Sequence, residues 1–272
     1  MARFVVVPQW QGSPSARAMA LVDGAEAIAG DLPAAACMRV AVPLEAGERL
    51  ETGVQRASAL LRVRESIASA VAAEDSPAIV IGGDCSVTVP AIDALADDDL
   101  AVVWFDAHGD LHSPETSPSG AFSGMALRAV LGEAGADLSL RPGRVSASRV
   151  VLAGARDLEP AEADVATQEG IARLACDEIE GRPEALAEAV AATGAARVFV
   201  HIDVDVLDPA HLSGVSNAAP FGLTPAGLLA AIGALRARLP LAGAAITGFA
   251  PPTPAAAVDD MGAILRLVGA LA

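Results

Sequence analysis

Residues 101–112, AVVWFDAHGDLH, join an uninterrupted apolar run to a group of acidic and imidazole side chains. A short, continuous run of Val, Trp and Phe is typical of a β-strand that is covered on both faces. Similar runs occur elsewhere in the chain, and each ends in a turn or a polar cluster. We therefore predict strands at residues 4–7, 40–42, 78–81, 101–105, 150–152, 198–206 and 244–249.

Longer Ala-rich segments, with Leu, Ile and Val at helical spacing, separate several of these runs. Thr224 is placed to cap a helix at residues 225–239, and Pro183 suits a first helical turn. The alternation of strands and helices favours an α/β fold with a mostly parallel sheet and helices on both faces. The chain shows no linker or internal repeat, so we expect residues 1–272 to form a single domain. The other predicted helices cover residues 54–73, 183–192 and 258–271.

The chain is strongly acidic, because 34 Asp and Glu against 18 Lys and Arg give a formal net charge of −16. This charge argues against nucleic acid or an anionic membrane as a partner, and no apolar stretch is long enough to span a bilayer. The three cysteines, Cys37, Cys85 and Cys176, are odd in number and lack a C-x-x-C spacing, so we expect no disulfide framework. The N-terminus lacks the apolar length of a signal peptide, and we expect a cytoplasmic protein.

The first polar cluster follows the strand predicted at residues 101–105. Ligand sites in parallel sheets lie beyond the carboxyl ends of the strands, and alternate side chains of an extended chain share a face. On this basis Asp106, His108 and Asp110 converge on one point. Carboxylate and imidazole groups are ligands for Mn²⁺, Fe²⁺ or Zn²⁺. A polar loop with caps and turns would use the same residue types.

The second cluster lies in residues 201–209, HIDVDVLDP. Asp203 and Asp205 share a face of a strongly apolar strand. Two buried carboxylates repel each other and need a metal, a proton or a basic partner, and the motif contains no Lys or Arg. Asp208 and Pro209 indicate a turn, and we expect no metal there.

The third cluster, residues 82–86 with the sequence GGDCS, follows the run at 78–81. Its two glycines allow the backbone to turn sharply and to approach a site. Cys85 would then point towards a ligand, although a lone thiol is as often a buried structural residue.

Together these motifs, in this order and spacing, resemble the ureohydrolase family of arginase, agmatinase and formimidoylglutamase. Residues 154–159, GARDLE, and 222–224, GLT, extend the resemblance. It implies a three-layer α/β/α fold with about eight mostly parallel strands and a centre of two Mn²⁺ ions, whose bridging hydroxide attacks an amidine or guanidinium carbon. It also implies a small-molecule substrate and a homo-oligomer, such as a trimer or hexamer. By position, Asp106 and Asp203 would bridge both ions, His108 and Asp205 would complete one shell, and Asp110 and Cys85 the other.

The chain departs from the family in its metal ligands and proton carriers. Family members usually have His at the position of Cys85, and a thiolate favours Zn²⁺ or Fe²⁺ over Mn²⁺. We therefore expect the ion at His108 to bind more reliably than the ion at Cys85. Ser123 stands where the family has a histidine thought to shuttle protons, and Ser does not titrate near neutral pH. We expect Asp110 and His112 to serve catalysis, with an ordinary surface-loop histidine as the alternative for His112.

The substrate positions also differ from those of the family. Residues 248–251, GFAP, contain no acid where the family has a glutamate that holds the guanidinium or amidine group. A buried guanidinium needs a carboxylate partner, which argues against arginine or agmatine. Ser119, Asp157 and Glu159 match positions near the polar tail of the substrate, and loop solvation or helix capping would explain them equally well.

We therefore predict a metal-dependent hydrolase that cleaves C–N bonds, other than peptide bonds, in a linear amidine or related small molecule. Two readings remain open beside it. One is a binding or regulatory protein that keeps the fold with one metal or none. The other is a deacylase with a single Zn²⁺, since deacetylases share this type of fold.

Overall fold

The computed structural model describes residues 3–74, 76–135 and 137–272. Eight parallel strands form one sheet in the order β2-β1-β3-β8-β7-β4-β5-β6. The strands are β1 (Arg3–Val7), β2 (Cys37–Arg39), β3 (Ala78–Gly82), β4 (Leu100–Phe105), β5 (Val150–Ala153), β6 (Ala172–Leu174), β7 (Arg197–Asp203) and β8 (Leu241–Thr247).

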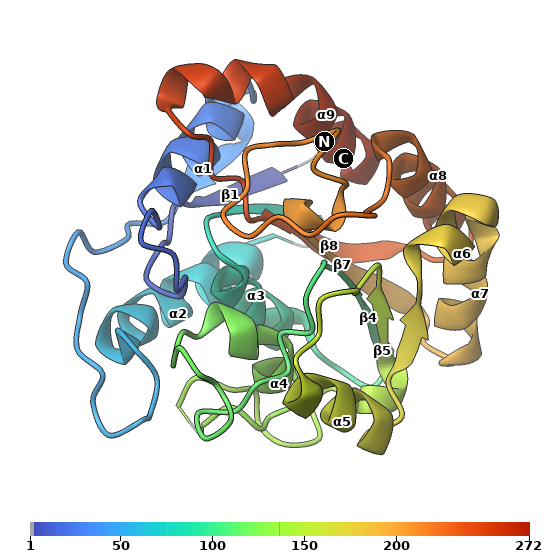
Figure 1. Cartoon of the computed structure of the whole chain (residues 1–272), viewed down its shortest axis with the longest axis horizontal. Coiled ribbons are helices and arrows are strands. Elements are labelled where there is room, and N and C mark those ends of the chain that lie inside the picture. Colours follow the sequence, from blue (N-terminus) through green and yellow to red (C-terminus); the bar gives the residue numbers. More distant parts are fainter. Residues whose placement is uncertain (1–2, 75, 136) are drawn as a thin grey trace.

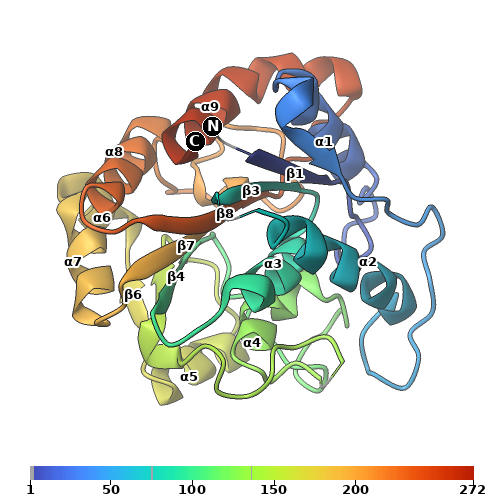
Figure 2. The same ribbon diagram turned by 180° about the vertical axis from the view of Figure 1, so that it is seen from behind.

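Helices cover both faces of this sheet (Figures 1 and 2). Successive strand residues alternate between two apolar cores, so that Val5 and Trp104 belong to one core and Phe4 and Phe105 to the other. The first core packs against α2 (Ala57–Val71), α3 (Thr88–Leu95), α4 (Ala126–Val130) and α5 (Pro160–Gln168). The second packs against α1 (Ala20–Gly30), α6 (Cys176–Gly181), α7 (Glu184–Ala192), α8 (Pro225–Arg236) and α9 (Ala257–Leu271). The α/β fold with three layers is therefore confirmed.

Local signals fix the start of α8, which the sequence predicts, and of α5, which it does not predict. The hydroxyl of Thr224 accepts a hydrogen bond from the backbone N–H of Gly227, as expected of the residue that caps α8. Helix α5 begins with Pro160 after Glu159, and the side chain of Glu162 accepts from the backbone N–H of Glu159. This capping box fixes α5 beside the carboxyl end of β4.

The sheet differs from the prediction at its edges. The strand predicted at residues 40–42 is β2, three residues earlier, although Val40 still donates its N–H to the carbonyl of Val6 at 3.0 Å. The strand β6 was not predicted, because two of its three residues are exposed and lack an apolar run. Edge strands are covered less than central ones, so their apolar pattern is weaker. Residues 204–206 leave the sheet as a 3₁₀ turn.

The central strands β3, β4 and β7 carry the three polar clusters at their carboxyl ends. Because all the strands are parallel, these ends meet on one side of the sheet. Among the described residues, every helix falls short of the length and apolarity that a bilayer crossing requires.

Candidate metal centre and its cavity

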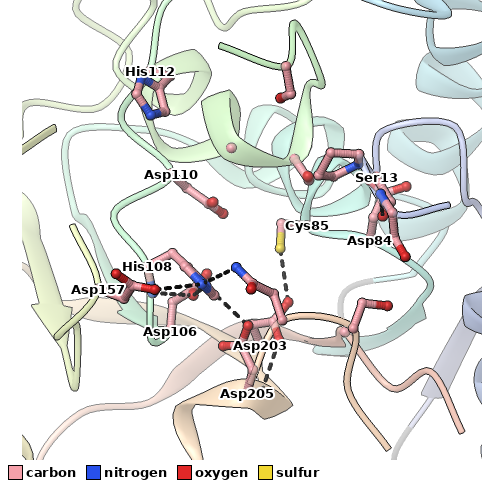
Figure 3. A pocket seen from close by; sticks show the side chains of 18 of the residues that line it. Ser13, Asp84, Cys85, Asp106, His108, Asp110, His112, Asp157, Asp203 and Asp205 are labelled. Carbon is pink, nitrogen blue, oxygen red and sulfur yellow. Dashed lines mark hydrogen bonds and ion pairs between the residues drawn. The ribbon is translucent and has the colours of Figure 1, made fainter. Parts of the chain in front are cut away.

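A cavity of about 470 Å³ opens over the carboxyl ends of β3, β4 and β7. Every residue that the sequence analysis singled out for metal, catalytic or substrate roles lines it, and Figure 3 shows most of them pointing inwards. The carboxyl ends of β3, β4, β5 and β7 and the loops after them thus bring together Cys85, Asp106, His108, Asp110, His112, Ser119, Asp157, Glu159, Asp203 and Asp205.

The acidic side chains converge through turns and not through an extended strand, so that part of the prediction was wrong. Strand β4 ends at Phe105, and the carboxylate of Asp106 accepts the backbone N–H of His108 at 2.7 Å. Asp203 accepts the N–H of Asp205 in the same way at 3.0 Å. A short acidic side chain that bonds two residues ahead bends the backbone into a turn. The segments at residues 106–108 and 203–205 therefore each form a tight turn at the carboxyl end of a strand.

One group of candidate ligands gathers around His108. Its Nδ1 atom lies 3.2 Å from an oxygen of Asp106 and 3.1 Å from an oxygen of Asp205. The other oxygen of Asp205 accepts the backbone N–H of Ala107 at 3.1 Å. The Nε2 atom of His108 lies 2.7 Å from Nδ2 of Asn217. This group can offer one nitrogen and two carboxylates to a cation.

A second group gathers around Cys85, whose thiol donates to Asp203 at 3.0 Å (Figure 3). Potential ligand atoms of Cys85, Asp106, Asp110 and His201 lie within 4.8 Å of one another. The two groups share Asp106, so the cations they would hold lie side by side. His201 was missed by the sequence analysis, although it stands two residues before Asp203 in β7 and could have been placed on the same face.

Asp84 holds Cys85 in place from below. One carboxylate oxygen accepts the backbone N–H of Ser86 at 3.0 Å, and the other accepts that of Gly12 at 2.9 Å. Gly83 allows close contact with the segment that follows β1, since a Cβ there would lie 1.7 Å from the carbonyl oxygen of Gln9. The buried Cys85 and Asp84 both line the cavity (Figure 3), and the hydrogen bonds of Asp84 fix the turn that carries Cys85.

The site concentrates negative charge where water is scarce. Burial raises the pKa of Asp203 to about 7, and burial together with the Asp106 carboxylate raises the pKa of Asp110 well above its usual range. Burial alone would lower the pKa of His108, but its hydrogen bonds with Asp106 and Asp205 raise it to about 12. Burial also raises the pKa of the Cys85 thiol strongly. Such a group of buried acidic side chains requires bound protons or cations to offset its negative charge.

The potential ligand atoms of the site suit divalent cations. Oδ2 of Asp110 and Nε2 of His201 are buried and have no hydrogen-bond partner among the described residues. Unsatisfied polar atoms are costly inside a protein and are usually explained by an ion or water. Carboxylate, imidazole and thiolate groups together suit Mn²⁺, Fe²⁺ or Zn²⁺.

Without a cation, the folded protein should lose stability as the pH rises. The pKa of Asp203 is about 7 in the folded chain against 3.8 for a free aspartate, and the pKa of His108 is about 12 against 6.5 for a free histidine. In both cases the folded state holds protons that the unfolded state has released, so the free energy of unfolding falls with pH. We expect a chelator-treated sample to show a higher Tm at about pH 5.5 than at about pH 8, and Mn²⁺ to raise Tm most at the higher pH.

The matched control for this prediction is Asp203→Asn, which removes one of the titrating groups and should flatten the dependence of Tm on pH. A Tm of the chelator-treated protein that rises between these two pH values would contradict the electrostatic description of the site.

His112 lies in the wall of the cavity with 6% of its surface exposed, so the reading as an ordinary surface-loop histidine is wrong. Its Nδ1 atom lies 3.2 Å from the Thr116 hydroxyl. Its Nε2 atom lies 3.5 Å from Glu159 and 3.9 Å from Glu162. Glu162 was not predicted; its position three residues after Glu159 is the sequence signal of the capping box. His112 is thus oriented by an acidic pair towards the cavity.

The remaining candidates form the rim. Asp157 and Glu159 have exposed side chains at 68% and 57%. Ser119 is in an exposed loop, where its hydroxyl accepts the N–H of Ala121 at 3.2 Å. Asp208 does not reach the cavity, and its carboxylate accepts the N–H groups of Ala210 and Gly222 at 2.9 and 3.0 Å. The expectation of a turn at Asp208 and Pro209 is confirmed.

Comparison with known proteins finds a matching family. The model of the Arginase family matches residues 14–266. The chain belongs to the arginase family. This family is the ureohydrolase group that the sequence motifs indicated, so that prediction is confirmed.

Members of the arginase family resemble the chain in sequence and in fold. A curated arginase of Staphylococcus aureus (strain MRSA252) is 30% identical over 195 residues, which are 68% of this chain and 65% of that protein. A curated N(omega)-hydroxy-L-arginine amidinohydrolase of Streptomyces lavendulae is 30% identical over 67% of this chain and 64% of its own length. The chain thus spans just under two thirds of these relatives. The crystal structure of Entamoeba histolytica arginase with L-ornithine superimposes with a TM-score of 0.88 at 20% identity, covering 99% of this chain and 97% of that one.

Proposed function

We propose that the chain is a metal-dependent hydrolase of C–N bonds in a linear amidino compound or a related small molecule. The observation that carries this proposal is the convergence of four buried aspartates with His108 and Cys85 at one cavity. Membership of the arginase family and the names of its relatives, which include an amidinohydrolase, support the same chemistry.

The residues suit two adjacent divalent cations. Asp106 offers an oxygen to both groups and Asp203 accepts from the Cys85 thiol, so we assign both acids to the pair of cations. His108 and Asp205 would hold one cation, and Asp110 and Cys85 the other. Bound cations would neutralise the acids and make a water molecule more acidic, which is the usual use of a two-metal site. Mn²⁺ is the first candidate because of the family, and the thiol of Cys85 makes Zn²⁺ or Fe²⁺ the alternatives.

Proton transfer falls to the chain's own residues. We assign it to Asp110, which is buried and lines the cavity, and to His112, which is oriented by Glu159 and Glu162. Ser123 lines the cavity beside them but has no proton to exchange near neutral pH. A histidine held by carboxylates is well placed to accept and return a proton.

The rim suits a substrate with a polar, cationic tail. Asp157 and Glu159 supply negative charge at the cavity mouth, and Ser119 supplies a hydroxyl. By contrast, residues 248–251 bring no carboxylate, and Phe249 and Ala250 are buried. We therefore propose that the reacting group is less strongly charged than the guanidinium of free arginine. A single domain over residues 1–272, a cytoplasmic location and a trimeric or hexameric assembly stay predictions.

The second candidate is a binding or regulatory protein of the same family. Ser123 and the acid-free segment at residues 248–251 favour it, because both replace residues that the family uses for turnover. Such a protein would bind a ligand in the cavity without hydrolysing it.

A substrate screen separates the two candidates. The purified chain is loaded in turn with Mn²⁺, Zn²⁺ and Fe²⁺ and incubated with guanidino, N-hydroxyguanidino, formimino and amide compounds, while urea, ammonia and formamide release is measured. We expect metal-dependent turnover of at least one neutral or weakly basic member, at a rate well above that on arginine. Inactivity of a fully metal-loaded sample on every class would favour the binding protein.

A further inference from the structure

We propose that His201 is a nitrogen ligand of the cation held by Cys85 and Asp110, so that this position has a nitrogen, sulfur and oxygen ligand set. The inference rests on the proposed two-cation centre and adds to it a ligand from inside the sheet. His201 lies in β7, two residues before Asp203 and on the same face of the strand.

The imidazole ring of His201 is fixed on two sides. It stacks on Trp104 with ring centroids 3.7 Å apart and an interplanar angle of 21°. Its Nδ1 atom lies 2.8 Å from the hydroxyl of Thr88, the first residue of α3. With 0% of its surface exposed, the ring has no alternative orientation towards solvent. A metal-binding histidine typically has its second ring nitrogen held in this way.

The free nitrogen, Nε2, is directed at the cation site. It has no hydrogen-bond partner among the described residues, and the nearest acid, Asp106, is 4.0 Å away, beyond hydrogen-bond distance. Ligand atoms of Cys85, Asp106, Asp110 and His201 all lie within 4.8 Å of one another. Metal–ligand bonds of about 2.0–2.3 Å in a tetrahedral shell separate the ligand atoms by about 3.3–3.8 Å. The separations in the structure exceed these values by at most about 1 Å, so one cation could draw the four atoms together.

A purely structural histidine explains these contacts less well. In that reading Nε2–H would point at Asp106 without reaching it, and a buried polar group would stay unpaired at a cost of about 1–3 kcal/mol. Oδ2 of Asp110 is unpaired in the same place among the described residues. One cation between the two atoms satisfies both. A neutral imidazole also adds a donor without adding to the negative charge of Cys85, Asp106 and Asp110.

The ligand set indicates the class of cation. Imidazole together with thiolate favours Zn²⁺, Fe²⁺ or Co²⁺ over Mn²⁺, whereas the group around His108 has only nitrogen and oxygen donors. The two positions should therefore differ in metal preference, with the softer cation beside Cys85 and His201.

Cation binding by variants tests the proposal without relying on turnover. Wild-type protein, His201→Phe, His201→Gln and Cys85→Ser are stripped of metal, titrated with Zn²⁺ and Co²⁺, and followed by bound-metal content and by the thiolate-to-Co²⁺ absorption band. His211→Phe is the matched control, because His211 is an exposed histidine in the turn after the same motif. We expect two equivalents in the wild type and the control, and a loss of at least about a hundredfold in affinity for one equivalent in His201→Phe and His201→Gln. The absorption band should shift in both His201 variants and vanish in Cys85→Ser.

X-ray absorption of the Zn²⁺-loaded wild type gives a second readout that does not depend on a variant's folding. Two imidazole nitrogens shared by two ions would support His201 as a ligand, and one imidazole for two ions would refute it. Unchanged titrations and spectra in folded His201→Phe would also refute it while leaving the two-cation centre intact. A wild type that binds no cation would instead overturn the proposed function itself.

Discussion

Asp106→Asn is expected to abolish metal-dependent hydrolysis, with a loss of at least about a thousandfold in kcat/KM. Asp106 contributes an oxygen to both groups of candidate ligands, and its side chain is 1% exposed. Asparagine has nearly the same shape but carries no charge. The variant should therefore fold, bind fewer cations and lose the negative charge that holds two cations side by side.

The loss is measured as bound metal per chain and as product release on the best substrate of the screen. Asp208→Asn is the matched control, since Asp208 lies in the acidic motif of Asp203 and Asp205 but caps a turn outside the cavity. It should keep both cations and most of the activity. Asp106→Asn protein with two bound cations and undiminished turnover would refute the proposed role of Asp106.

Gly248→Ala is expected to disable the site although the change adds only a methyl group. Gly248 has a φ of +81°, and a Cβ there would lie 2.0 Å from a carboxylate oxygen of Asp203. Its N–H also donates to the carbonyl of Gly83 at 2.8 Å, so the backbone cannot move away without breaking that bond. The methyl group must therefore push Asp203 out of position. We expect at least a hundredfold loss of cation affinity and a Tm lower by roughly 5 °C.

Gly262→Ala provides the control for Gly248→Ala. Gly262 lies in helix α9, and a Cβ there meets no atom within 4 Å. Alanine is favoured over glycine inside a helix by about 1 kcal/mol, so this variant should gain stability and keep its cations. Equal cation affinity in Gly248→Ala and the wild type would show that Asp203 is not held against Gly248 as described.

The sheet could be predicted from the sequence wherever a strand is covered on both faces. The run at residues 101–105 is such a strand, and its apolar pattern is continuous because helices pack on both sides. The edge strand β6 was not predicted, and β2 was predicted three residues too late. Both errors arise because side chains of edge strands are partly exposed and can be polar. Short helices such as α4 carry too few residues for a helical period to be visible in the sequence.

The sequence predicts which residues belong to the candidate site but not how their side chains are arranged. The acids stand directly after buried strands, so the parallel topology alone brings Asp106 and Asp203 to the same end of the sheet. The turns that orient these acids depend on hydrogen bonds that the carboxylates accept from backbone N–H groups. The spacing of residues in the sequence does not reveal such bonds. His201 was overlooked because a histidine inside an apolar strand suggests a packed core residue; only its unpaired Nε2 distinguishes it.

The cation content of the purified protein tests the proposed two-cation site most directly. After removal of metal, the chain is equilibrated with Mn²⁺ or Zn²⁺, freed of unbound ions, and analysed for metal per chain together with the anomalous scattering of a crystal. We expect two neighbouring cations, one beside His108 and one beside Cys85, with Asp106 and Asp203 between them. A fully folded chain that retains no cation at these aspartates would contradict this expectation.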